Sequence, residues 1–164
     1  MLASADIVDV LRDGSGAFQH GHTYLAHPMA CAAALEVQRV IDDEQLLDRV
    51  KHLGRQLERR LTERFGNHRH VGDIRGRGLF QAIELVADRA TRAPFDPALK
   101  LHQRIKAAAF DGGLGCYPAG GCADGRSGDH VLLAPPYIAT PDDIDMIVDR
   151  LGHAVDSALK SVGH

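Results

Sequence analysis

The longest periodic stretch of apolar residues lies between positions 46 and 65. Leucine, valine and phenylalanine recur there at steps of three and four residues, which places them on one face of a helix. The apolar positions are Leu46, Leu47, Val50, Leu53, Leu57, Leu61 and Phe65. Charged residues between them form a solvated face. We therefore expect an amphipathic helix that is capped by Asp42 or Asp43 and ends at Gly66.

A second periodic stretch follows Thr140. Thr140 is expected to cap this helix, with Pro141 as its first residue and Asp143 at the acidic third position. Its buried stripe is predicted to contain Ile144, Ile147, Val148, Leu151, Val155 and Leu159. The pattern predicts a long helix near the end of the sequence.

Two further helices are predicted from composition and from their end signals. Residues 28–41 are rich in alanine, the best helix former, and begin with Pro28, which is favoured in a first helical turn. Residues 97–111 form the other helix, which Gly112 and Gly113 end.

The remaining apolar segments are shorter and suit strands. Residues 79–86 predict a strand, with Gly76 and Gly78 in the turn before it. The glycine-rich residues 112–128 predict a loop, and "VLLAPP" predicts a short buried strand that two prolines end. This order of helices and strands indicates an α/β or α+β fold that packs helices on a small sheet.

Composition and charge narrow the class of protein. The chain has 164 residues, 45% hydrophobic and 25% charged, with a formal net charge of −3. This charge offers no general attraction to nucleic acids or anionic membranes, and we expect neither as a partner. No apolar run has the length of a membrane span, and the first residues lack the basic region of a secretory signal. We therefore expect a cytoplasmic protein.

The cysteines and histidines are the residues that could form disulfides or bind a metal. The three cysteines are spaced too irregularly for a disulfide framework or a zinc pair, so we expect plain thiols. Ten histidines are present, including His68 and His70 on an expected loop. No Cys, Asp or Glu cluster completes a ligand set there, so we expect no metal. The glycine-rich residues 112–128 also lack the ending of a P-loop.

A polar cluster stands directly before the alanine-rich helix, in "AFQHGHTYLAHP". Gly21 gives the backbone freedom, Thr23 brings a hydroxyl and an N–H, and His20 and His22 add possible donors. Because helix N-termini favour anions, one interpretation is an oxyanion or phosphate contact. The other interpretation is a helix cap among ordinary polar loop residues. The residues by themselves leave both open.

Three segments in order carry a resemblance to a known family. They are "GSGAFQHGHTYLAHPMACAAALEVQRVI", "VGDIRGRGLFQAIELV" and "DHVLLAPPYIATPDDIDMIVDRL". Together they resemble the C-terminal part of the class III aminotransferases, fold-type-I pyridoxal-phosphate enzymes that include the omega-transaminases. The resemblance implies that residues 1–38 are the tail of the cofactor-binding large domain. Residues 39–164 would then form the small C-terminal domain.

The resemblance also assigns a role to the polar cluster. In this family the threonine of the "HTY" element contacts the phosphate of the pyridoxal 5'-phosphate bound by the neighbouring subunit of a dimer. The matching residue is Thr23, and Gly21, His22 and Tyr24 are its local supports. The implied partner is a second aminotransferase subunit, in a homodimer for the parent enzyme.

The Schiff-base lysine of the family is not found at its expected place. It lies upstream of the "HTY" element, whereas the first lysine here is Lys51. The N-terminal "MLASADIVDV" resembles the strand and helix that follow this lysine in the family, with Met1 where a small apolar residue is usual. The resemblance therefore implies a fragment with no catalytic residue of its own. We expect no transamination by this chain alone.

The substrates can be narrowed by the same resemblance. Leu133 stands before "APP", where the ornithine and acetylornithine branches have an arginine. The nearest candidate for a mobile acceptor-binding arginine is Arg126. We therefore expect a parent enzyme that transfers an amino group from an amine or omega-amino acid to a 2-oxo acid such as pyruvate. The alternative is a non-catalytic small-domain module that binds a full-length aminotransferase subunit.

Overall fold

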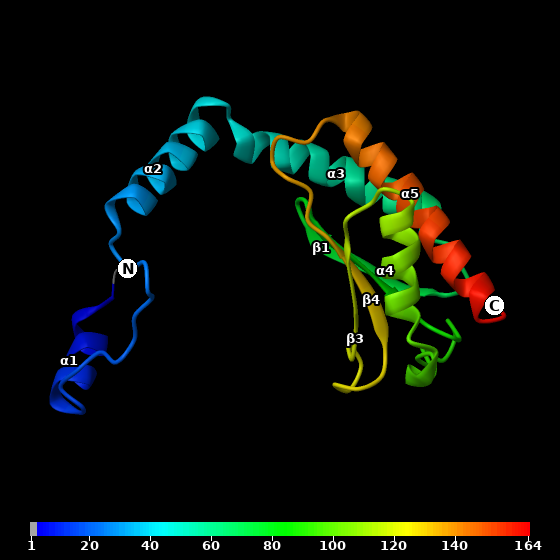
Figure 1. Ribbon diagram of the computed structural model, residues 1–164, viewed down its shortest axis with the longest axis horizontal. Coiled ribbons are helices and arrows are strands. Elements are labelled where there is room, and N and C mark those ends of the chain that lie inside the picture. Colours follow the sequence, from blue (N-terminus) through cyan, green and yellow to red (C-terminus); the bar gives the residue numbers. More distant parts are fainter. Residues whose placement is uncertain (1–2) are drawn as a thin grey trace. The chain divides into compact units, whose positions relative to one another are not determined.

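The computed structural model describes residues 3–164 and divides the chain into two units, Met1–Val40 and Ile41–His164 (Figure 1). The expected match of Met1 to a family position lies outside the described residues. The assignment of residues 1–38 and 39–164 to a large and a small domain stays a prediction.

The first unit contains one short helix and most of a longer one. Helix α1 spans Ala5–Asp13, and helix α2 spans Pro28–Asp43 and continues past the unit's last residue. Helix α2 confirms the helix that Pro28 and the alanine run predict. None of the residues of α1 or α2 is buried in the described structure. These helices therefore form without a core of their own.

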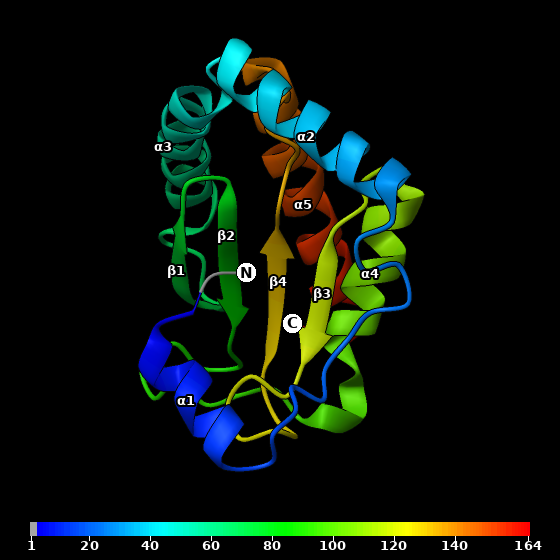
Figure 2. The ribbon, with the colours of Figure 1, turned by 90° about the vertical axis from the view of Figure 1, so that its left-hand side faces the viewer.

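The second unit is built on a four-stranded antiparallel sheet in the order β1-β2-β4-β3 (Figure 2). The strands are β1 (Val71–Arg77), β2 (Phe80–Leu85), β3 (Tyr117–Gly120) and β4 (Asp129–Leu133). Ile83 in β2 is opposite Ile74 in β1 and Val131 in β4, so apolar side chains align across the sheet.

Helices cover one face of this sheet (Figure 1). They are α3 (Leu46–Phe65), α4 (Leu101–Asp111) and α5 (Pro141–Ser161), and the short 3₁₀ helix η1 (Pro97–Leu99) precedes α4. Burial alternates along β2 and β4, because successive side chains point to opposite faces. The buried residues form one core between the sheet and the helices. This arrangement confirms the α+β expectation.

The predicted turn at Gly76 is wrong. Gly76 lies inside β1, opposite Gln81 of β2, and the turn is made by Gly78, whose φ of 57° suits glycine. A side chain at Gly76 would collide with the carbonyl oxygen of Phe80. The glycine therefore serves the close approach of two strands, which a local pattern resembling a turn does not reveal.

The predicted loop at 112–128 is partly wrong, because it contains strand β3. This strand has only four residues, among them Pro118, which lacks an N–H for a sheet. Pro118 is tolerated because β3 lies at the edge of the sheet and pairs with β4 alone. Loop-like composition therefore hides an edge strand.

The start of α3 also differs from the expectation. Asp42 and Asp43 belong to α2, and Gln45 precedes α3 with a left-handed φ of 50° and no side-chain cap bond. Leu47 is 56% exposed rather than buried. At the other long helix the expected capping box is confirmed: the Thr140 hydroxyl accepts the Asp143 N–H, and the Asp143 carboxylate accepts the Thr140 N–H.

Candidate functional site

The polar cluster before α2 folds into two successive turns. The N–H of Leu25 donates to the carbonyl of His22 at 3.0 Å, and the N–H of His27 donates to the carbonyl of Tyr24 at 3.1 Å. Ala26 adopts a left-handed φ of 56° between them. Because Thr23 is the second residue of the first turn, it lies at a bend of the backbone.

Thr23 keeps its hydrogen-bonding groups available. Across residues 3–164 neither its hydroxyl nor its N–H has a hydrogen-bond partner, and the residue is exposed. Gly21 leaves open space beside the backbone, because a Cβ there would meet nothing within 4 Å. Two unpaired donors on one exposed residue suit an anion supplied from outside this turn.

The neighbouring rings pack against one another. His20 and His22 meet edge to face with centroids 5.0 Å apart, and Tyr24 meets His27 at 6.3 Å. Their place beside Thr23 suits the supporting role expected for His22 and Tyr24. None of the four residues Gly21–Tyr24 is buried, so the turn gives at most part of a binding site.

The sequence around the turn carries no carboxylate that would repel an anion. No aspartate or glutamate occurs between Asp13 and Glu36, a stretch that contains three histidines and the start of α2. The positive end of the helix dipole lies at Pro28, five positions after Thr23. The absence of carboxylates between Asp13 and Glu36 can be seen in the sequence, and it is independent of the "HTY" element. The donor set fits one edge of a phosphate group.

Arg126 belongs to the second unit and lies in the hairpin loop between β3 and β4. The Asp124 carboxylate accepts the N–H groups of Ser127 and Arg126, which lower the pKa of Asp124 and fix the loop. Among the described residues the Arg126 guanidinium has no ion-pair partner, and it is exposed. The loop thus presents a free cation at its tip.

The four lysines all lie in the second unit and none takes part in the Thr23 turn. Lys51 on α3 pairs with Asp48 at 2.8 Å, and Lys106 and Lys160 lie on α4 and α5. Lys100 directly precedes α4. Three of the four lysines therefore lie inside helices.

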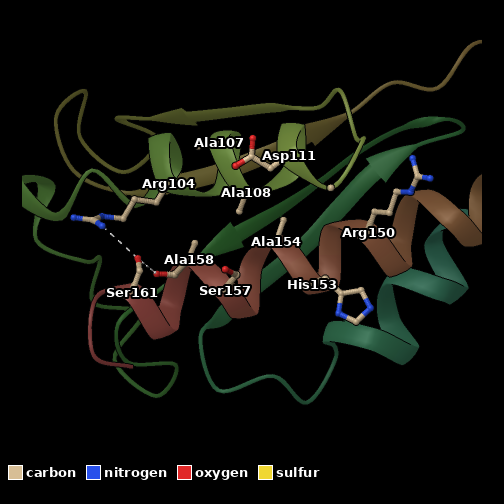
Figure 3. A pocket seen from close by; sticks show the side chains of 11 residues that line it. Arg104, Ala107, Ala108, Asp111, Arg150, His153, Ala154, Ser157, Ala158 and Ser161 are labelled. Carbon is tan, nitrogen blue, oxygen red and sulfur yellow. Dashed lines mark hydrogen bonds between the residues drawn. The ribbon is translucent and has the colours of Figure 1, made fainter.

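The second unit has a groove of about 540 Å³ between α4 and α5 (Figure 3). Small side chains line its floor, including Ala107, Ala154 and Ser157. Arg104 at one end donates to Ser161, and Arg150 at the other donates to the Gly113 carbonyl. Since these cations are already engaged and no predicted site residue lies there, the groove is not a candidate active site.

The described residues show neither a metal site nor a membrane helix. Within residues 3–164 no group of three His, Cys, Asp or Glu residues could hold a metal ion. Over the same residues no helix has the length and hydropathy to cross a bilayer.

His70, which the sequence places on a loop, is fully buried. Its Nδ1 lies 3.1 Å from the Val86 carbonyl oxygen, a location that its loop-like sequence context does not reveal.

Known proteins resemble this chain over nearly its whole length. The family model for class III aminotransferases matches residues 1–155. An aminotransferase of Gibberella zeae is 42% identical over 160 residues, which cover 97% of this chain and 31% of the relative. The chain therefore spans about a third of the length of the relatives it matches.

Solved structures give the same result. A thermostable omega transaminase from Pseudomonas jessenii superposes with a TM-score of 0.78 at 33% identity, over 97% of this chain and 33% of that one. A pyridoxal-phosphate-bound aminotransferase from Vibrio fluvialis reaches a TM-score of 0.81 at 32% identity, with 97% and 33% covered. These likenesses confirm the expected C-terminal part of a fold-type-I transferase.

Proposed function

The chain belongs to the class III aminotransferase family, and on that premise we propose that it serves as the C-terminal portion of an amino-transferring enzyme. The enzyme would use pyridoxal 5'-phosphate to move an amino group from an amine or omega-amino acid to a 2-oxo acid. The observation that carries this proposal is a family match over nearly the whole chain, with Thr23 of the "HTY" element exposed and its donors unpaired.

Thr23 has the part of a phosphate ligand in this proposal. Its hydroxyl and N–H donate to the cofactor phosphate, and Gly21 leaves room for the phosphate to approach the backbone. The His22 carbonyl, held by the Leu25 N–H, fixes the turn that presents Thr23. When bound, pyridoxal phosphate supplies an electron sink at the substrate carbon. Since the turn buries none of these residues, the phosphate must be held mainly by other residues.

We place that phosphate on a second subunit. An exposed turn with unpaired donors suits a contact between subunits, and it agrees with the dimer that the family resemblance implies. The Schiff-base lysine would likewise come from residues that this sequence does not span, because Lys51 and the later lysines follow the "HTY" element, whereas the family's lysine precedes it. Activity therefore requires the portion of the enzyme that relatives carry and these 164 residues do not.

The acceptor is proposed to be pyruvate or a similar 2-oxo acid. Arg126 is the candidate for its carboxylate, because the guanidinium is exposed and has no ion-pair partner among residues 3–164. Leu133, which stands before "APP", gives no cation for the second carboxylate of 2-oxoglutarate. The relative from Halomonas elongata that is 35% identical is a diaminobutyrate–2-oxoglutarate transaminase, so the acceptor requires direct measurement.

A second candidate function is a non-catalytic module that binds a full-length aminotransferase subunit. The observation that favours it is the complete core of the second unit, in contrast to the first unit, where α1 buries no residue. A module of this kind would associate with a full-length subunit and leave its turnover unchanged. Association without a change in rate therefore separates it from a catalytic portion.

A graft tests the proposed function. The C-terminal third of the Vibrio fluvialis aminotransferase is replaced by these 164 residues, and amine-dependent formation of alanine from pyruvate is measured. Turnover with retained cofactor supports a catalytic C-terminal portion, and the same graft with Arg126→Ala should show a raised KM for pyruvate. A folded, dimeric graft that retains cofactor but has no turnover with any amine contradicts the proposal.

A further inference from the structure

A buried histidine closes one end of the second unit. His70 precedes β1, is 2% exposed, and its ring Nδ1 lies 3.1 Å from the Val86 carbonyl oxygen. Its other ring nitrogen, Nε2, is also buried and has no hydrogen-bond partner among the described residues. A neutral ring that donates from Nδ1 satisfies this geometry, because it carries no proton on Nε2.

Two further rings join His70 to the segment that follows α5. The His70 ring lies 5.3 Å from that of Phe95 and 5.1 Å from that of His164, and Phe95 and His164 are 5.2 Å apart. The His164 N–H donates to the Leu159 carbonyl and thereby continues the end of α5. The three rings therefore attach this turn to the start of β1. Figure 1 marks the C-terminus at the end of this turn.

The charges around this ring cluster are mostly positive. Burial is the largest cause that lowers the pKa of His70, and Arg69 on its own segment and His164 after α5 lower it further, while the backbone groups of Val86 and Ala87 raise it. His68 is 6.1 Å away, ring to ring, and its own pKa is lowered mainly by burial. The charge of Asp156 raises the pKa of His68, and Arg64 on α3 lowers it.

The nearby carboxylate of Asp156 raises the pKa of His68 but is not among the causes that shift the pKa of His70. Asp156 on α5 pairs with Arg64 at 2.5 Å and lies 3.6 Å from Nε2 of His68. Arg89, after β2, donates to the Gly66 carbonyl in the connection that leads to His70. A proton on His70 would thus meet cations and no free acceptor at Nε2 in the described structure.

We propose that His70, Phe95 and His164 form a latch that a proton on His70 releases. A second N–H at Nε2 would be buried without an acceptor, so the ring leaves its pocket and the turn after α5 detaches from β1. Because the neutral ring is favoured in the folded state, the latch is fully closed above the ordinary histidine pKa near 6.5. It opens as the pH falls through the lowered pKa of His70.

Hydrogen exchange on the 164-residue chain at pH 7.5 and 5.5 tests this latch. After correction for intrinsic rates, the amides of Val162, Gly163 and His164 should lose protection on the order of tenfold at the lower pH. Amides of Ile83 and Val131 in the sheet should keep theirs. His70→Phe keeps a ring that cannot take a proton, so its turn should be equally protected at both values.

Controls separate a latch from general acid destabilisation. His153→Phe removes an exposed histidine of α5 and should behave like the unchanged chain. A ring titration by NMR should give His70 a pKa that coincides with the loss of protection. Unchanged protection in the native chain, the same pH dependence in His70→Phe, or parallel loss at Ile83 and Val131 would each overturn the proposal.

Discussion

Asp129 on β4 holds the first turn of α4 through His102. One oxygen of its carboxylate accepts the His102 N–H at 3.0 Å and also lies 2.6 Å from Nδ1 of the same residue. Asp129 is 4% exposed, so these contacts replace water around a buried charge. The pair joins the start of the interior strand β4 to a helix that has no side-chain cap of its own.

Replacing Asp129 by alanine should destabilise the second unit by about 2 kcal/mol, because a buried N–H and a ring nitrogen lose their acceptor. The free energy of unfolding in urea measures the change. Asp129→Asn keeps one acceptor oxygen and should cost less. Asp124→Ala removes an exposed carboxylate that also accepts two N–H bonds, and an equal loss there would show that burial of Asp129 is unimportant.

Gly54→Ala should also destabilise the second unit. A Cβ at Gly54 would lie 2.6 Å from the Cα of Gly78, so α3 and the β1–β2 turn would have to move apart. Overpacking of this kind typically costs about 2 kcal/mol, which a shift of the thermal midpoint would report. Gly115→Ala is the matched control, since a Cβ there meets nothing within 4 Å. Equal midpoints for the two variants would contradict the close packing.

Thr140→Ala should weaken the start of α5 by about 1 kcal/mol, the usual cost of losing a cap. The Thr140 N–H and hydroxyl lower the pKa of Asp143, so this support is present at neutral pH and is lost as the pH falls through the lowered pKa. The difference between native and variant in urea should therefore shrink in acid. Thr62→Ala, whose hydroxyl bonds only within α3, should change little.

The periodic apolar residues predicted the long helices, because the buried residues of each helix are spaced three and four positions apart along its own sequence. The stripe of α5 and the box of Thr140 and Asp143 depend on residues three and four apart, which a sequence displays directly. Strand β1 was hidden because Gly76 serves contact with Phe80 of the next strand. That reason lies in tertiary structure, so a local pattern treats the glycine as a turn.

The candidate site was predictable only through family resemblance. The residues alone leave Thr23 between a helix cap and an anion contact, whereas in the described structure its hydroxyl accepts no N–H of α2 and so does not cap that helix. The structure shows that Thr23 lies in the turn closed by His22 and Leu25 and that its donors have no partner among the described residues. A sequence does not show this. The partner groups would lie outside the 164 residues, so their geometry cannot be derived from this chain.

Thr23→Ala should weaken cofactor binding in the grafted enzyme. The loss of one charge-assisted hydrogen bond to a phosphate corresponds to roughly tenfold or more in the dissociation constant. Cofactor fluorescence during dialysis measures this constant, and turnover should recover at saturating cofactor because Thr23 is proposed to touch only the phosphate. Thr23→Ser keeps the hydroxyl and should bind as the unchanged graft does, while Thr62→Ala controls for the loss of an exposed threonine. If Thr23→Ala bound the cofactor as tightly as Thr62→Ala, the phosphate would be held without this turn, and the exposed donors of Thr23 would serve only the loop before α2.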